Sequence, residues 1–262
     1  MSWVQGFRER QSLVDRSPQD FQVGKISMSL IITTAIGFGA AALLWFFFRP
    51  PFGKNIVRLN TSQRVVALTY DDGPNPPYTE RLLDVLAKHN VKATFFMIGN
   101  RIEKHPETVN RIITEGHQIG NHSYSHPLLG FLPPFYIQRQ IERTDDLIRQ
   151  HGITEKTVFR APVLTRFLPV AYVLAKRDRI HISCDVWSWD WTTQNPDKIT
   201  ETVLRKTKPG SIIVLHDGKA GNKNANRSGT IEATDRIITA LKQDGYQFVR
   251  LSDYLAVGSN QS

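Results

Sequence analysis

The chain has 262 residues, 40% of them hydrophobic and 22% charged, and its formal net charge is +9 at pH 7. Its single cysteine, Cys184, excludes an intramolecular disulfide, and no histidine or other base adjoins it to make it a nucleophile. The basic residues are scattered and no nucleic-acid-binding motif is present, so we expect no nucleic acid partner. An anionic cell wall or membrane surface explains the positive charge better.

The N-terminal part of the chain predicts a membrane anchor. No charged residue occurs between Lys25 and Arg49, so the run from Ile26 to Phe48 is uncharged, and such a run can cross the ~30 Å hydrocarbon core of a bilayer. Trp45 lies near one end, where interfacial tryptophans are common. A cleaved signal peptide is less favoured, because the run is long and no small-x-small cleavage site follows it. A buried soluble helix is less favoured still, because the run is apolar all round.

The first strand of the following domain ends in two carboxylates. The apolar, β-branched run 65–68 is typical of a buried parallel strand, and Asp71, Asp72, Gly73 and Pro74 follow it closely. Consecutive side chains of a strand point to opposite sides, so the two aspartates can have different roles. Because burying unpaired carboxylates is costly, we expect a cation or a hydrogen-bonded partner beside them. An isolated Asp-Asp-Gly would more simply be a solvated turn.

Helical and strand-like patterns alternate along the rest of the chain. Helices are predicted at residues 77–90, 135–151, 196–206 and 229–245, and strands at 93–98, 118–119, 157–158, 180–186, 211–214 and 247–249. This alternation indicates an α/β fold with a parallel sheet. About 200 residues can bury a substantial single core. The segment 218–229, rich in Lys, Asn and Gly, is expected to be a mobile loop beside His216.

Two histidines suggest a metal site. His122 and His126 are four residues apart, so both can reach one divalent ion. The pair alone is a weak signal, but with Asp72 it provides three protein ligands and leaves positions open for water and substrate, as in catalytic zinc sites. His117 and His181 flank apolar strand residues and are expected to be structural.

Other polar residues follow later strands. Arg160 comes after the strand 157–158, Asp190 after 180–186, and His216 after 211–214. Parallel α/β sheets build their active sites where the carboxyl ends of the strands meet. His216 can act as a general acid because its unperturbed pKa is near 6.5, and Arg160 can orient a carboxylate. Each of these residues alone would have an ordinary structural explanation.

Taken together, the motifs resemble those of the polysaccharide deacetylases, the NodB-like class of carbohydrate esterases. The motifs occur in the family's order: TYDDGP (69–74), HSYSH (122–126), FRAP (159–162), DVWSWDW (185–191) and LHD (215–217). The resemblance covers about residues 60–256. It implies a distorted (β/α) barrel, related to the TIM barrel, with fewer than eight regular strands.

The resemblance also implies residue roles. Asp71 is expected to be the catalytic base, and Asp72, His122 and His126 to hold one divalent metal, zinc in the first place, with cobalt or another divalent ion as the alternative. Arg160 is expected to orient the base, and Asp190 to be the supporting carboxylate. His216 is expected to be the general acid, and Trp191 and Leu215 to form the walls of the acetyl pocket.

Two departures from the family pattern affect the expected substrate groove. Val163 stands where the family usually has an aromatic residue whose backbone N–H binds the oxyanion, so the N–H is retained and the ring is lost. Cys184 replaces an early tryptophan of the fourth motif, whereas Trp187 and Trp189 are additional. We therefore expect a reshaped groove wall.

The implied activity is metal-assisted removal of N-acetyl groups from an amino-sugar polysaccharide, with peptidoglycan N-acetylglucosamine favoured and chitooligosaccharide second. Alternatives are an O-acetyl xylan-type esterase and a non-catalytic glycan-binding protein. The charges flanking the uncharged run are balanced and do not set its orientation, but a sugar-polymer substrate favours an extracytoplasmic catalytic domain. The expected organisation is a cytoplasmic segment (1–25), a membrane anchor (26–48), a tether (49–62), a catalytic domain (63–256) and a tail (257–262).

Overall fold

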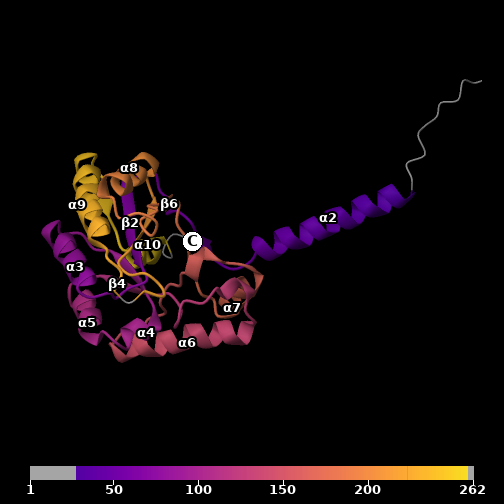
Figure 1. The fold of residues 1–262 in the computed structure, drawn as a ribbon, viewed down its shortest axis with the longest axis horizontal. Coiled ribbons are helices and arrows are strands. Elements are labelled where there is room, and N and C mark those ends of the chain that lie inside the picture. Colours follow the sequence, from indigo (N-terminus) through magenta and orange to yellow (C-terminus); the bar gives the residue numbers. More distant parts are fainter. Residues whose placement is uncertain (1–27, 223, 259–262) are drawn as a thin grey trace, which may run out of the picture. The chain divides into compact units, whose positions relative to one another are not determined.

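The computed structural model describes residues 28–222 and 224–258 (Figure 1). The chain divides into two compact units, Met1–Trp45 and Phe46–Ser262. Helix α2, Met28–Phe48, supplies the described part of the first unit and extends into the second.

The predicted membrane anchor is not confirmed. Within the part of the chain that the structure describes, no helix is both long enough and apolar enough to cross a membrane. Residues 26 and 27 of the predicted span, and the whole of the predicted cytoplasmic segment 1–25, lie outside the described residues.

The second unit is built on a parallel sheet with strand order β4-β3-β2-β7-β6, and β8 pairs with the start of β2. A separate parallel pair, β1 and β5, is connected to β4 through single bridges that Phe159 makes with Asn121 and His181. This arrangement confirms the expected parallel α/β fold. The strands are β1 Asn55–Ile56, β2 Val65–Asp71, β3 Thr94–Met97, β4 Gln118–Asn121, β5 His181–Ile182, β6 Val186–Trp187, β7 Ile212–His216 and β8 Gln247–Phe248.

Helices surround these strands (Figure 1). The four predicted helices are present within a few residues of their expected ends, and α8 matches at both ends. Its start is fixed by Asn195, whose side chain accepts a hydrogen bond from Lys198 N at 3.1 Å. The α-helices are α3 Tyr78–Lys88, α4 Gly99–Ile102, α5 Pro106–Thr114, α6 Pro134–Gln150, α7 Leu168–Lys176, α8 Pro196–Lys206, α9 Ser228–Gln243 and α10 Leu251–Gly258. Two short 3-10 turns cover Leu129–Phe131 and Pro162–Leu164.

Strand β2 lies in the centre of the sheet, and all seven of its residues are buried. Its side chains alternate between two cores: Val66, Leu68 and Tyr70 pack with residues of α3, α5, α8 and α9, whereas Val65 and Ala67 pack on the opposite face of the sheet with Phe96, Ile212 and Val214. Thr69 and Asp71 point to the same side as Val65 and Ala67. The strand therefore places Asp71 on this second face at its carboxyl end.

A predicted strand differs from the structure. The strand expected over 180–186 is split into β5 and β6 because its two halves pair with different partners, β1 and β7. Within the predicted tether 49–62, β1 pairs with β5, and the buried Leu59 donates its N–H to Gly210 O at 2.8 Å.

Candidate active site

Asp71 is held by a buried arginine. The Nη1 of Arg160 donates to Asp71 Oδ1 at 2.7 Å and to Thr69 Oγ1 at 2.8 Å. The guanidinium has no solvent-exposed surface, and its other donors reach the carbonyls of Ile182 and Ser183. These contacts fix the orientation of the Asp71 carboxylate, as expected for the predicted partnership of Arg160 and Asp71.

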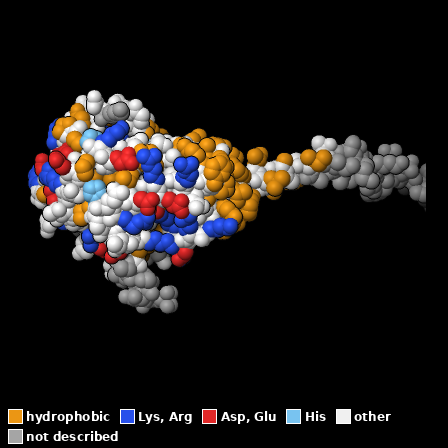
Figure 2. Space-filling model, turned by 90° about the horizontal axis from the view of Figure 1, so that it is seen from below, with side chains coloured by type: hydrophobic (Ala, Val, Ile, Leu, Met, Phe, Trp, Pro, Cys, Tyr) orange, Lys and Arg blue, Asp and Glu red, His pale blue; other side chains and the backbone are white. Residues whose placement is uncertain are grey.

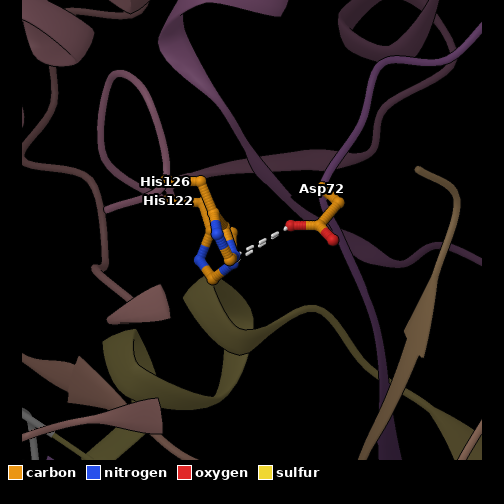
Figure 3. Close-up of side chains that lie close together, drawn as sticks. All are labelled: Asp72, His122 and His126. Carbon is orange, nitrogen blue, oxygen red and sulfur yellow. Dashed lines mark ion pairs between the residues drawn. The ribbon is translucent and has the colours of Figure 1, made fainter. Parts of the chain in front are cut away.

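Asp72, His122 and His126 form a compact cluster of ligand atoms (Figure 3). Asp72 Oδ1 lies 3.2 Å from His126 Nε2 and 3.6 Å from His122 Nε2. Asp72 follows the last residue of β2 and adopts a left-handed backbone with φ of 74°, which turns its side chain toward the histidines after β4. The structure thus brings together the three residues that were predicted to hold a metal.

The donor set fits a divalent cation. His122 donates its Nδ1–H to the Arg160 carbonyl at 2.8 Å, which leaves Nε2 with a free lone pair. Burial, only partly opposed by Asp71 and Asp72, lowers the pKa of His122 to about 4, so this imidazole is neutral and makes no true ion pair with Asp72. Asp72 Oδ1 is buried and has no hydrogen-bond partner, which is costly unless a cation occupies the site.

His216 pairs with a second buried carboxylate. Its Nδ1–H donates to Asp190 Oδ1 at 2.7 Å, and its backbone N–H donates to Asp190 Oδ2 at 2.8 Å. Burial would lower the pKa of His216, but Asp190, with Asp72 and Asp71, raises it to about 9. Asp190 also accepts hydrogen bonds from Ser188 and Thr230. The imidazole is therefore oriented and protonated at neutral pH, as a general acid must be.

These residues line one cavity of about 270 Å³. Asp71, Asp72, His122, His126 and His216 form its floor and are joined by a ring of mainly apolar residues, which comprises Val163, Leu164, Trp187, Trp191, Val214, Lys219 and Ala220. Trp191 lies edge-on to His216, with 5.3 Å between the ring centroids. A mainly apolar cavity with few converging polar groups is typical of a small-molecule binding site.

Leu215 does not have the position that was predicted for it. It is fully buried and belongs to the core between the sheet and the helices, with Tyr70 and Val186. Side chains alternate along β7, so Val214 and His216 face the cavity and Leu215 faces away from it. Val214 therefore provides the wall that was expected from Leu215.

The remaining buried histidines have structural contacts. His181 Nε2 accepts a hydrogen bond from Ala161 N at 3.1 Å, and His117 Nδ1 accepts one from Ala93 N at 3.1 Å. Burial lowers the pKa of both. Both contacts agree with the structural role expected from the sequence.

Several supporting residues were not predicted. Arg101 donates to the carbonyls of Lys219 and Asn222, and Ala220 N donates to Asp72 Oδ2 at 3.0 Å. These bonds hold part of the segment that was expected to be a mobile loop against Asp72 and Arg101. Arg101 carried no recognisable signal, because it lies in a four-residue helix far from the motifs.

Two glycines allow the loops of the site to approach closely. A Cβ on Gly73 would lie 1.9 Å from Asp217 Oδ2, and a Cβ on Gly218 would lie 2.1 Å from the Asp72 carbonyl oxygen. Asp217 is buried and accepts a hydrogen bond from Thr79 Oγ1 at 2.6 Å. Asp217 stood within the LHD motif, yet its supporting role is visible only in the structure.

The fold and the site define a hydrolase with a candidate metal centre at the carboxyl edge of a parallel sheet, and the comparisons agree. The family model described as polysaccharide deacetylase matches residues 58–177. A peptidoglycan-N-acetylglucosamine deacetylase of Bacillus cereus is 38% identical over 189 residues, covering 71% of this chain, and the chain spans 66% of that relative's length. A chitooligosaccharide deacetylase of Sinorhizobium fredii is 36% identical over 200 residues, covering 74% of this chain and 93% of the relative.

A solved structure supports the same relationship. The crystal structure of the Bc1960 peptidoglycan N-acetylglucosamine deacetylase matches with a TM-score of 0.72 at 34% sequence identity, covering 76% of this chain and 92% of the other. The chain therefore belongs to the polysaccharide deacetylase family.

Proposed function

We propose that the protein removes N-acetyl groups from an amino-sugar polysaccharide, with N-acetylglucosamine of peptidoglycan as the preferred substrate. One observation carries the proposal: Asp71, held by Arg160, and His216, held by Asp190, line the same cavity as the cluster of Asp72, His122 and His126. A base, an acid and a candidate metal site thus surround a space that fits an acetyl group.

Each residue has a role in this reaction. Asp71 accepts the proton of the attacking water, and Arg160 keeps its carboxylate oriented. The backbone N–H of Val163 helps to bind the oxyanion. His216 donates a proton from its imidazolium to the leaving nitrogen, and Asp190 holds the ring. A divalent cation bound by Asp72, His122 and His126 supplies Lewis-acid polarisation of the carbonyl and a lower pKa for its water, with zinc as the first candidate and cobalt as an alternative.

The state of His216 favours an amide over an ester substrate. An amine leaves only when it is protonated, whereas an alkoxide of a sugar is a less demanding leaving group. Asp190 keeps His216 protonated at neutral pH because the pKa of the imidazole is raised to about 9. This supports N-deacetylation over the O-acetyl xylan-type alternative.

The named relatives support an N-acetylated glycan as the substrate, but they do not distinguish peptidoglycan from chitooligosaccharide. They include a peptidoglycan-N-acetylglucosamine deacetylase and a chitooligosaccharide deacetylase. We place peptidoglycan first and chitooligosaccharide second. A non-catalytic glycan-binding role is less favoured, because every predicted polar catalytic residue lies in position around the cavity or supports one that does.

The test is acetate release measured side by side on three substrates. The protein, loaded with Zn²⁺, is incubated with peptidoglycan, N-acetylglucosamine oligomers and O-acetylated xylan, and the products are identified by mass spectrometry. We expect a mass loss of one acetyl group on the N-acetylated glycans, and a release roughly 10²–10⁴-fold slower in the Asp71→Asn variant. Release from xylan alone would contradict the proposal, and no release from any of them would favour the glycan-binding alternative.

We propose an extracytoplasmic location for the catalytic domain, because a cell-wall polymer is accessible only there. The predicted anchor at residues 26–48 is part of the same proposal. Cell fractionation and external protease treatment test both together. Full-length protein in salt-resistant membrane fractions, with a catalytic domain digested from outside, is the expected result. A shortened, freely soluble extracellular protein would identify a cleaved export signal, and full-length protein in the cytosol would contradict the location.

A further inference from the structure

Three tryptophans, Trp187, Trp189 and Trp191, form a cluster beside the cavity. The ring centroids of Trp189 and Trp191 are 4.8 Å apart with an interplanar angle of 39°, and those of Trp187 and Trp189 are 6.1 Å apart. The ring of Trp191 also contacts that of His216, with 5.3 Å between their centroids. A series of neighbouring aromatic rings therefore leads from His216 through Trp191 to Trp189.

Trp189 is the exposed member of this cluster. Its residue is 48% exposed, whereas Trp187 and Trp191 are half-buried and line the cavity. A single exposed apolar residue is normal on a protein surface. The exposure of Trp189 becomes informative because the residue is continuous with the walls of the catalytic cavity through Trp191.

The backbone of Trp189 provides an independent observation. Its φ is 61°, in the left-handed region that is unfavourable for a large side chain. Its carbonyl accepts hydrogen bonds from Thr192 N at 3.0 Å and Thr192 Oγ1 at 2.8 Å, and the next residue is the buried Asp190. Unfavourable backbone conformations that the surroundings hold in place occur most often at functional sites. This conformation keeps Asp190 inside and the indole of Trp189 outside.

We propose that Trp189 forms a sugar-binding subsite, on which the apolar face of the ring next to the deacetylated sugar stacks. The proposal rests on the proposed function and adds which residue contacts the sugar next to the one that loses its acetyl group. The C–H bonds on one face of a pyranose are weakly positive and the face of an indole is negative, so the two attract each other. An indole in this position also provides an aromatic surface in a groove where Val163 lacks one.

The expected signature is a dependence on chain length. In the full-length protein, Trp189→Ala should lower kcat/KM for a long N-acetylglucosamine oligomer by about 2- to 12-fold, the range that corresponds to one aromatic contact. The loss should lie in KM with kcat nearly unchanged. The shortest oligomer that the enzyme accepts should be turned over at the wild-type rate, because it does not reach Trp189. Trp189→Phe should retain most of the increase in kcat/KM that the wild type shows as the oligomer becomes longer.

Two controls separate a subsite from a structural effect. Tyr172, on α7, is 42% exposed and lies outside the cavity lining, so Tyr172→Ala should leave every oligomer unaffected. If Trp189→Ala perturbs folding, Trp189→Gly removes the same ring at a position whose φ suits glycine. An equal loss on short and long oligomers, no loss on either, or the same loss in Tyr172→Ala would overturn the proposal.

Binding separates this proposal from the proposed function. Titration calorimetry of long and short oligomers with the wild type and with Trp189→Ala requires no turnover. Absence of acetate release by the wild type would contradict only the proposed function. Equal affinity of the two proteins for the long oligomer would contradict only the subsite.

Discussion

Asp71 and Asp72 are adjacent in the chain but have different partners. Asp71 accepts a hydrogen bond from Arg160 at 2.7 Å, whereas Asp72 faces His122 and His126 with one unpartnered oxygen. We expect Asp71→Asn to retain the metal and lose roughly 10²–10⁴-fold in kcat, the usual contribution of a positioned base. Asp72→Asn should lower the affinity for the metal itself, because it removes an anionic ligand.

Metal content after dialysis, measured together with kcat, checks this division of roles. Equal metal binding and equal loss of activity in the two variants would show that the aspartates are not specialised in this way.

The state of His216 predicts how activity depends on pH. The group acts as an acid only while it is protonated, so activity is retained below its pKa and lost as the pH rises through it. Burial lowers that pKa and Asp190 raises it, with a net value of about 9. Asp190→Asn should therefore move the alkaline limb of kcat/KM to lower pH, toward the ordinary histidine value of about 6.5.

Profiles of kcat/KM recorded with saturating metal in both proteins provide the measurement, because the cation then affects His216 equally in each. An unchanged alkaline limb in Asp190→Asn, or a wild-type kcat/KM that does not fall as the pH rises through 9, would exclude His216 as the general acid.

Val163 combines an exposed side chain with an unfavourable backbone. It is 64% exposed and has φ of 54°, a conformation that costs an L-residue roughly 1–2 kcal/mol. Val163→Gly removes this cost and loses little packing, although glycine has a larger backbone entropy in the unfolded chain. We expect the free energy of unfolding to rise by about 0.5–1 kcal/mol.

Urea unfolding of the wild type, Val163→Gly and Val163→Ala measures this effect. Val163→Ala is the matched control, because it shortens the side chain and retains the left-handed cost. A glycine variant no more stable than the alanine variant would show that the backbone at this position is not strained.

At the scale of elements, the positions of the main strands and helices could be predicted from the sequence, because local residue patterns determine them. The run 65–68 and the residues 211–214 became the central strands β2 and β7, and the Asn-Pro pair at 195–196 marked the start of α8. The sequence did not reveal partner choice. Residues 180–186 form two strands because the halves pair with β1 and β7, and the choice between Val214 and Leu215 for the cavity wall depended on the face of β7.

The motifs predicted part of the candidate site, because residue type and spacing indicate which side chains can bind a metal or transfer a proton. The residues found in this way are Asp71, Asp72, His122, His126, Arg160, Asp190 and His216. Arg101 and Thr79 could not be found in this way, because they act by holding a loop and a buried carboxylate that meet only in the folded chain.

The end of α2 belongs to the catalytic unit. Phe47 and Phe48 pack against Phe167, with centroid distances of 5.8 and 4.7 Å, and Phe47 also lies 6.2 Å from Phe131. Arg166 donates to Pro50 O and Gly53 O just beyond. A fragment that begins at Pro51 loses these phenylalanines and should be about 1–3 kcal/mol less stable than one that begins at Phe46.

Thermal unfolding of the two fragments tests this contact. Phe167→Ala, introduced into both, is the control: it should destabilise the longer fragment more than the shorter one, because only the longer one contains the partners of Phe167. Equal stability of the two fragments would show that the domain does not use residues 46–50.

At the scale of the whole molecule, the candidate metal site connects segments that are far apart in the sequence. Asp72 follows β2, the histidines follow β4, and the loop after β7 closes over Asp72 through Ala220. A ligand that binds only the folded chain stabilises it by about 2.7 kcal/mol at 100 times its Kd. For a domain of this size, Zn²⁺ should therefore raise Tm by roughly 5–10 °C, and a chelator should reverse the shift.

His126→Ala should abolish this response, because two remaining protein ligands rarely hold a catalytic metal. His151→Ala is the matched control, since His151 lies at the end of α6 and pairs with Asn110 Oδ1 at 2.7 Å rather than with the cluster. Scanning calorimetry with Zn²⁺ or Co²⁺ distinguishes the two variants. A shift of equal size in both would place the cation outside the cluster, and the assignment of Asp72, His122 and His126 as its ligands would fail.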